Sequence, residues 1–281
     1  MQIRLLATTV LFAALAFAAP SAASAKLKTE TATGGAVQAV LTYNVKSQLI
    51  FDVTDTHLTI TRNGATVLDT NVPEPCNGCG VAPAGAGGGS AKSLRIADLD
   101  GDGEPEVLLD IYTGGAHCCL DTWIYRFTGS SYTGTPALWG DVGYTLKDLD
   151  GDGVPELRSF DDRFAYVFTA YAASWFPPQI WQFRAGVLNN VTRSYPKIVR
   201  ADAKRALRTY RHEKKVDVRG VLAGYVADEY LLGHGATGWK LVRSALKHGY
   251  LNGFGRGDAW PRNGRYVRSL RKFLRKTGYI S

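Results

Sequence analysis

Long hydrophobic runs are missing from this sequence except at its N-terminus. The single run, residues 5–19, follows the basic Arg4 and leads to the small residues Ala23-Ser24-Ala25, which is the order found in a secretory signal peptide. It is shorter than the roughly 20 apolar residues of a spanning helix, so a membrane anchor is the weaker interpretation. We therefore predict a cleaved signal peptide at 1–25, followed by a soluble chain that is secreted or otherwise extracytoplasmic.

Short hydrolase motifs are also missing. The chain has no G-x-S-x-G, and the segment HEKKV at His212 lacks the second histidine of a zinc-protease helix. Asp161 and Asp162 are a carboxylate pair, but neighbouring residues on a strand point to opposite faces and make poor partners. We therefore assign no catalytic residue and favour a non-catalytic binding or adhesion role. The alternative is an exported hydrolase whose active site lies between the β and helical parts.

Cysteine is scarce, with four residues in the whole chain. Cys76 and Cys79 lie in the segment CNGC, and Cys118 and Cys119 follow His117 in the segment GGAHCC. In an exported protein these cysteines are expected to form disulfides, and the strained ring of a bond between adjacent cysteines favours links between the two segments. The alternatives are a zinc site, with His117 as a candidate ligand, and a redox-active CxxC pair.

Charge is distributed unevenly along a chain whose net charge is +8. Residues 26–195 carry 12 basic and 19 acidic side chains, whereas residues 196–281 carry 20 basic and 6 acidic ones. The net charges of the two parts are therefore −7 and +14. This division predicts an acidic domain at 26–195 and a basic domain at 196–281.

The acidic part has the pattern of β-strands. Apolar and polar residues alternate over residues 37–45, and Asn63-Gly64 is a strong signal for a tight hairpin turn. The basic part changes to a helical period, with an apolar stripe along residues 199–210. We therefore predict an α+β multidomain protein in which a β domain precedes a small α-helical bundle.

An acidic nonapeptide occurs twice. Residues 98–106 read DLDGDGEPE and residues 148–156 read DLDGDGVPE, so eight of nine positions agree. Carboxylates at alternate positions of a tight loop repel one another unless a cation lies between them, and oxygen ligands at this density favour calcium. We predict two calcium ions, one in each loop. The predicted ligands are four side chains and one backbone carbonyl in each loop: Asp98, Asp100, Asp102, Glu106 and the carbonyl of Glu104, then Asp148, Asp150, Asp152, Glu156 and the carbonyl of Val154.

These loops begin like an EF-hand but then depart from it. An EF-hand has glutamate at position twelve, where the two loops have Leu109 and Ser159. The pattern D-x-D-G-D-G-x-P-E before an apolar strand resembles the calcium loops of FG-GAP and VCBS repeats, except that Glu replaces the usual Asp at position nine. The resemblance covers residues 90–165, approximately, and implies propeller-blade-like repeats, of which two are too few to close a ring. The segment GGAHCC also resembles one found in uncharacterised exported bacterial proteins.

The partners follow from these two features. Calcium is interpreted as a structural ion that fixes turns, with bridging to a ligand as the alternative. The basic helices form a solvated exterior, dock on an anionic polymer or lipid surface, or pack against the acidic part; nucleic acid is not expected. The sequence thus predicts an exported calcium-binding protein with an unknown extracellular or cell-surface ligand.

Overall fold

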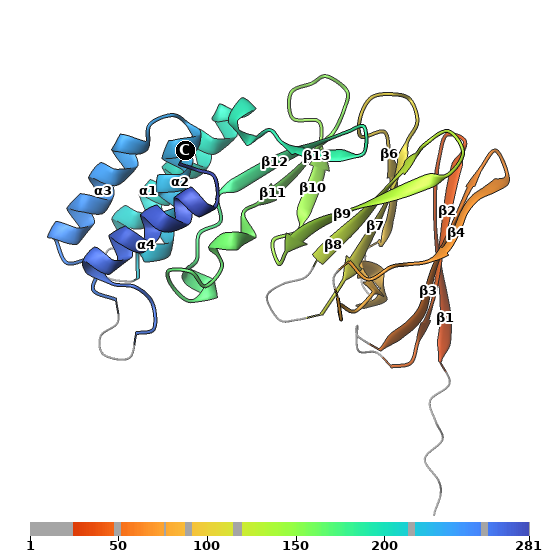
Figure 1. The fold of residues 1–281 in the computed structure, drawn as a ribbon, viewed down its shortest axis with the longest axis horizontal. Helices are drawn as coiled ribbons and strands as arrows, with labels where there is room; N and C mark the ends of the chain where they lie inside the picture. Colours follow the sequence, from red (N-terminus) through yellow and green to blue (C-terminus); the bar gives the residue numbers. More distant parts are fainter. Residues whose placement is uncertain are drawn as a thin grey trace, which may run out of the picture.

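The structure is a computed structural model that describes residues 25–47, 52–75, 77–87, 92–114, 120–212, 217–253 and 258–280. The predicted signal peptide lies outside these residues apart from Ala25. Figure 1 shows three β-sheets in a row, with a bundle of helices at the end of the row that is opposite β1–β4. In the described part of the chain, all the strands precede the four α-helices.

The first sheet contains four antiparallel strands in chain order: β1 (Lys26–Gly34), β2 (Val37–Val45), β3 (Val53–Arg62) and β4 (Ala65–Asn71). Alternate residues of β2 are buried, which is the burial pattern of a strand with one face toward the core. The turn between β3 and β4 has positive φ at both Asn63 (49°) and Gly64 (81°). Asparagine and glycine tolerate this conformation best, so the predicted hairpin forms where the sequence placed it.

The second sheet is the middle layer. It contains β5 (Ala82–Pro83), β6 (Leu94–Ala97), β7 (Glu106–Tyr112), β8 (Leu120–Phe127) and β9 (Tyr132–Gly140), and a short 3-10 helix, η1 (Ala84–Gly87), follows β5. Strand β7 is buried on both faces: Val107 and Leu109 pack in a core with the first sheet, and Leu108 packs in a core with the third. Its continuous apolar run is therefore explained by a neighbouring sheet on each side.

The third sheet contains β10 (Tyr144–Lys147), β11 (Glu156–Phe160), β12 (Pro178–Arg184) and β13 (Val187–Asn190), again antiparallel and in chain order. Two short 3-10 helices, η2 (Asp162–Phe164) and η3 (Tyr171–Ala173), lie in the connection from β11 to β12. A third, η4 (Thr192–Ser194), leads from β13 to the first α-helix. These connections carry the chain from the sheets to the helices.

The helical bundle consists of α1 (Pro196–His212), α2 (Arg219–Leu231), α3 (Gly235–Lys247) and α4 (Asn263–Lys276). Helix α2 is buried over nearly its whole length, whereas α1, α3 and α4 bury one stripe each. Phe164 and Phe168, which follow β11, meet Phe273 of α4 edge to face with ring centroids 4.8 and 5.4 Å apart. The core of the bundle therefore includes side chains from the β part.

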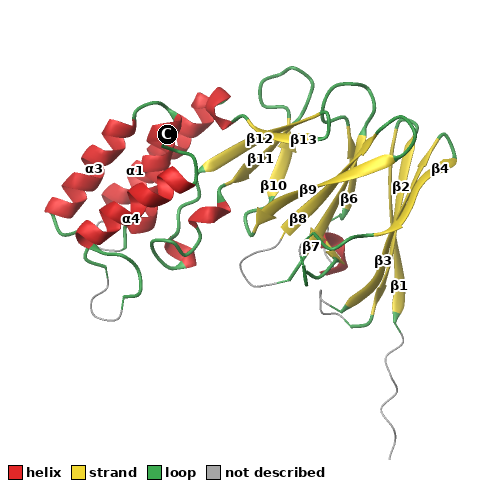
Figure 2. Ribbon diagram, viewed as in Figure 1, coloured by secondary structure: helices red, strands yellow, loops and turns green. Residues whose placement is uncertain are grey.

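The predicted propeller-blade-like repeats are wrong. The two acidic nonapeptides form the turns between β6 and β7 and between β10 and β11, in two different antiparallel sheets. Beyond the third sheet the row continues with helices, as Figure 2 shows, and the described residues form no closed ring or barrel. The nonapeptide specifies a turn within a sheet, but it does not specify how the sheets are arranged around one another.

Candidate functional site

The two acidic loops, residues 98–106 (loop 1) and 148–156 (loop 2), have the same local structure. Asp98 accepts backbone hydrogen bonds from Gly101 (2.7 Å) and Gly103 (3.0 Å), one on each carboxylate oxygen. Asp148 accepts the equivalent pair in loop 2, also at 2.7 and 3.0 Å. Both glycines of loop 1 have positive φ, 75° and 82°, which lets the backbone turn around the aspartate.

Three of the four predicted side-chain ligands come together in each loop. Their carboxylate oxygens lie within 4.8 Å of one another: Asp98, Asp100 and Glu106 in loop 1, and Asp148, Asp150 and Glu156 in loop 2. Glu106 is fully buried, with Oε2 accepting a hydrogen bond of 2.8 Å from the Leu99 N–H and Oε1 without a hydrogen-bond partner. Burial, assisted by the nearby aspartates, raises the pKa of Glu106 to about 7. A cation between these carboxylates would give Oε1 a partner and would lower the pKa of Glu106. The carboxylate oxygens therefore fit a hard ion such as calcium.

The other predicted ligands of loop 1 have protein partners. Asp102 pairs with Arg126 at 3.0 Å, and the same guanidinium reaches Asp100 at 3.2 Å. The side chain of Glu104, whose backbone carbonyl is the predicted ligand, accepts a hydrogen bond of 2.7 Å from Arg62 of β3. Arginine therefore already supplies positive charge on one side of loop 1. In loop 2, Asp152 accepts a hydrogen bond of 2.8 Å from the backbone N–H of Val154.

Both loops lie at junctions between parts of the fold. Arg184 of β12 donates to the Leu99 carbonyl at 3.0 Å, which connects loop 1 to the third sheet. Tyr195, immediately before α1, donates from its hydroxyl to Asp150 at 3.0 Å, which connects loop 2 to the helical bundle. The loops also touch, because a Cβ placed on Gly101 would lie 2.9 Å from Cγ2 of Val154. An ion in either loop would thus stiffen a junction between layers.

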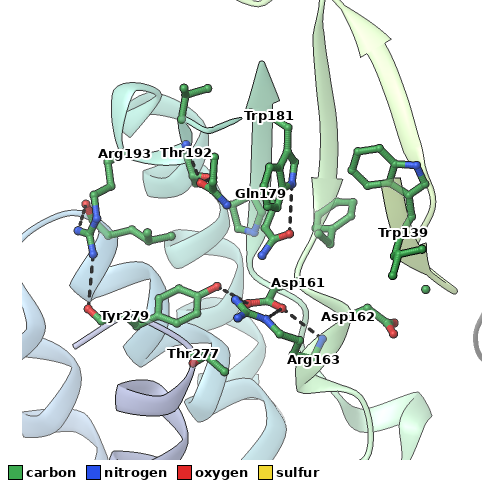
Figure 3. Close-up of a pocket in the computed structure, with 18 of the residues that line it drawn as sticks. Trp139, Asp161, Asp162, Arg163, Gln179, Trp181, Thr192, Arg193, Thr277 and Tyr279 are labelled. Atoms are coloured by element: carbon green, nitrogen blue, oxygen red, sulfur yellow. Dashed lines mark hydrogen bonds and ion pairs between the residues drawn. The ribbon is translucent and has the colours of Figure 1, made fainter. Parts of the chain in front are cut away.

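A cavity of about 920 Å³ lies between the third sheet, the end of β9 and the helical bundle. Figure 3 shows Trp139 and Trp181 coming from strands, with Arg193 and Tyr279 on the side of the helices. The Trp139 indole N–H donates to Thr122 at 3.0 Å, and the Trp181 indole N–H donates to Gln179 at 3.2 Å. The cavity therefore combines aromatic rings with polar side chains from several separate segments of the chain.

Asp161 connects the two sides of this cavity. It accepts hydrogen bonds of 2.7 Å on each carboxylate oxygen from Arg163, and one of 2.9 Å from the Tyr279 hydroxyl. Arg193 adds a second link from the β part, since it donates to the Tyr230 carbonyl at 2.9 Å. The position of the helical bundle beside the third sheet is therefore held by polar contacts that also line the cavity.

Asp162 is a cavity carboxyl with one unpartnered oxygen, although it accepts a backbone hydrogen bond from Asp141. Its Oδ1 is buried and has no hydrogen-bond partner, and burial raises the pKa of Asp162 above its usual value. Gly140 allows the carboxyl to sit there, because a Cβ on that glycine would lie 2.2 Å from Asp162 Oδ2. Burial also raises the pKa of Asp121, a second carboxyl of the cavity wall.

Asp161 and Asp162 do not lie on a strand, which was the premise for treating them as poor partners. Strand β11 ends at Phe160, and the two aspartates form the start of η2, where both line the cavity. Sequence reasoning did not find the contributions of Trp139, Arg193 and Tyr279. No local pattern marks these residues, since each comes from a different segment of the chain.

Cys79 is disulfide-bonded. The other candidates of the cysteine-rich segments, Cys76, His117, Cys118 and Cys119, lie outside the described residues. Thr113 and Asp121, on either side of the second segment, line the cavity. The pairing of the cysteines and the zinc alternative therefore stay predictions.

The helical bundle is the part of the chain that matches a protein-family model. Residues 199–278 match a protein-family model described as the sll0997 C-terminal domain. None of the described helices is long and apolar enough to cross a membrane. No solved structure matches the chain at a significant level.

Two curated proteins are similar over a larger part of the chain. A probable thylakoid lumen protein, sll0997 of Synechocystis sp., is 33% identical over 160 residues, which cover 53% of this chain and 46% of that protein. The uncharacterized protein y4bJ of Sinorhizobium fredii is 28% identical over 175 residues, which cover 60% of this chain and 26% of that protein. The chain thus spans less than half the length of these curated relatives.

These similarities test two predictions, the resemblance to calcium-binding repeats and the extracytoplasmic location. The resemblance to FG-GAP and VCBS repeats is wrong, because the matching family model and the similar proteins are of another kind. The predicted extracytoplasmic location is confirmed by similarity to a protein of the thylakoid lumen. The acidic nonapeptide therefore does not mark this chain as a member of the FG-GAP and VCBS repeats.

Proposed function

We propose that this extracytoplasmic protein is a non-catalytic binding protein whose ligand occupies the cavity between the third sheet and the helical bundle. The observation that carries the proposal is the cavity itself, which Trp181, Asp162, Gln179 and Asn190 line with an aromatic ring and polar side chains. The volume of about 920 Å³ is within the range of small-molecule sites.

The ligand class follows from the lining. Trp181 offers apolar ring surface, and Asp162, Gln179 and Asn190 offer polar groups that exchange hydrogen bonds with hydroxyls. This combination suits a neutral molecule that has apolar C–H faces and many hydroxyl groups. A short neutral saccharide has this chemistry.

The test is calorimetric titration of the secreted chain with neutral di- to tetrasaccharides built from glucose, galactose or N-acetylglucosamine. We expect binding by the wild type and a loss of about tenfold in affinity for Asp162→Asn, because the acceptor next to the ligand is changed. Asp69→Asn is the matched control, since it makes the same change on the exposed strand β4. Absence of binding by every saccharide, or equal affinity of wild type and Asp162→Asn, would contradict the proposal.

In this proposal the two acidic loops hold calcium as a structural ion. Support comes from the clustered carboxylates and from the buried, unpartnered Oε1 of Glu106. Bound calcium would supply the positive charge that these carboxylates need in a partly buried place. Each ion would hold its loop in one conformation. It would thereby stabilise the contact of Arg184 with loop 1 and that of Tyr195 with loop 2.

Calcium binding is tested by titrating calcium into metal-free protein. We expect two sites in the wild type, with Glu106→Gln removing the site in loop 1 and Glu156→Gln removing the site in loop 2, because each substitution removes a carboxylate from its cluster. Asp69→Asn again serves as the control and should keep both sites. A wild type that takes up no calcium at millimolar concentration would contradict this part of the proposal.

An exported hydrolase is the second candidate. It is favoured by the two cavity carboxyls, Asp121 and Asp162, whose pKa values are raised by burial, because a general acid must hold its proton near neutral pH. Turnover of chromogenic saccharides by the wild type that is lost in both Asp121→Asn and Asp162→Asn would establish catalysis. Binding without turnover would leave the non-catalytic function.

A further inference from the structure

Acidic and basic side chains of the helical bundle are separated by burial. The acidic residues Asp202, Asp217, Asp228 and Glu229 are buried, and the side chain of Asp258 is 1% exposed. By contrast, every described basic residue after Pro196 is exposed except Arg219, which is fully buried between Asp217 and Asp258. The described surface of the bundle is therefore cationic and has no exposed carboxylate.

The exposed bases form rows along three helices. The rows are Lys197, Arg200, Lys204, Arg208 and Arg211 on α1; Lys240, Arg243 and Lys247 on α3; and Arg265, Arg268, Lys272 and Arg275 on α4. Spacings of three and four residues keep each row on one side of its helix. At 1.5 Å per residue, the α1 row is about 21 Å long, with one charge at intervals of about 5 Å.

These rows have no acidic partner in the described structure. The ion pairs between described residues of the bundle join Arg205 to Asp202, Arg219 to its two aspartates and, when the imidazole is protonated, His234 to Glu229, and none reaches a row residue. No ion pair between described residues joins a row to the acidic β part either. Like charges three or four residues apart on a helix repel, so folding alone gains nothing from this arrangement. An anionic partner would relieve the repulsion.

We propose that the helical bundle binds a linear anionic polysaccharide along the rows of α1 and α4. A polymer that carries one carboxylate on each sugar presents charges in a line, as each row does, and a flexible chain can follow rows on separate helices. The extracytoplasmic location of the protein favours an envelope polysaccharide over nucleic acid. This surface is separate from the cavity, so it adds a second partner to the proposed binding function.

A membrane surface fits these observations less well. Helices that bind in a lipid interface insert apolar side chains beside their basic ones. The exposed large hydrophobic residues of the described chain are Leu27, Leu138, Tyr166 and Val187, and all of them precede the bundle. The apolar stripes of α1, α3 and α4 are used in the core. The rows therefore present charge without an apolar anchor.

The experiment compares three probes at low salt: polygalacturonate, neutral dextran, and vesicles that contain phosphatidylglycerol. We expect the full secreted chain to bind polygalacturonate, not dextran, and to lose this binding as salt increases, because exposed charges are screened. The double variants Lys204→Gln/Arg208→Gln and Arg268→Gln/Lys272→Gln should each bind about tenfold more weakly, as expected for two surface cations lost from an anionic contact. Lys26→Gln/Lys28→Gln on β1 removes the same charge elsewhere and should bind like the wild type.

Circular dichroism of each variant confirms that it is folded before binding is compared. Equal binding by wild type and both row variants would overturn the proposal, as would equal losses in the row variants and the β1 control. Tighter binding to vesicles than to polygalacturonate would also overturn it and assign the rows to lipid. Tighter binding to duplex DNA in a parallel titration would overturn it in favour of nucleic acid.

Discussion

The Tyr279 hydroxyl donates a hydrogen bond of 2.9 Å to Asp161 Oδ2, which joins two residues 118 positions apart in the chain. Asp161 follows the second strand of the third sheet, and Tyr279 follows the last helix. Both side chains are buried and both line the cavity. This contact connects the third sheet to the last segment that lines the site, so the cavity depends on how the helical bundle docks.

Removal of this hydroxyl should weaken the docking. We expect Tyr279→Phe to lower the free energy of unfolding by about 2 kcal/mol, because a buried hydrogen bond to a carboxylate is lost. Denaturation in urea provides the measurement. Tyr125→Phe is the control, since the Tyr125 hydroxyl is buried without a partner and its removal should be neutral or stabilising. Similar losses in both variants would argue against a special role for the Asp161 contact.

The stability of the ligand-free protein should depend on the protonation of Asp162. Burial raises the pKa of Asp162 above 3.8 in the folded state, aided by the neighbouring Asp141 and Asp161 carboxylates. At a pH between 3.8, the pKa of Asp162 in the unfolded chain, and its higher pKa in the folded chain, the folded chain holds more protons. The free energy of unfolding therefore falls as the pH rises through that interval. Asp162→Asn should remove this part of the pH dependence and be more stable than the wild type at neutral pH. Urea denaturation at several pH values checks this, and parallel curves for both proteins would contradict it.

Arg126 should compete with calcium in loop 1. Its guanidinium pairs with Asp100 and Asp102, so Arg126→Gln should tighten calcium binding at this loop roughly fivefold, as removal of a partly exposed cation implies. Calcium titration measures the effect, with binding at loop 2 as an internal reference. Lys26→Gln is the control for loss of one positive charge. Unchanged or weaker affinity at loop 1 would place the ion away from these aspartates.

The buried charges of the helical bundle should contribute strongly to its stability. Arg219 is fully buried and donates from one nitrogen to Asp217 and Asp258, at 2.7 Å each. Asp258→Asn weakens a charge-assisted hydrogen bond of the buried guanidinium, which keeps its pair with Asp217, and should lower the free energy of unfolding by about 2 kcal/mol. Asp69→Asn breaks an exposed pair with His57 and should lower it by less than about 1 kcal/mol. Thermal denaturation distinguishes the two, and equal effects would contradict the assignment.

Local features of the chain could be predicted because their partners are close in sequence. The hairpin turn at Asn63-Gly64 needs only two residues that tolerate positive φ. The acidic loops are likewise local, since Asp98 is bonded to N–H groups three and five residues away. The failure of the propeller prediction has the same origin, because a motif of nine residues contains no information on the packing of whole sheets.

The cavity could not be predicted, because its parts come from distant segments. Asp121 belongs to β8, Asp162 follows β11, Arg193 precedes α1 and Tyr279 follows α4. None of these residues is part of a spacing pattern. The adjacent carboxylates of Asp161 and Asp162 were expected to lie on a strand and to point to opposite faces. These residues line one cavity only because β11 ends at Phe160 and because the helical bundle packs beside the third sheet.

The sequence by itself determined the acidic loops, the hairpin and the helical rows of bases, because each depends on backbone geometry over a few residues. It also placed most basic residues in the last part of the chain. Only the tertiary structure decided which charges face solvent. Burial of Asp228 and its acidic neighbours depends on the packing of α2 between other elements, and this packing leaves the exterior of the helical bundle to the bases.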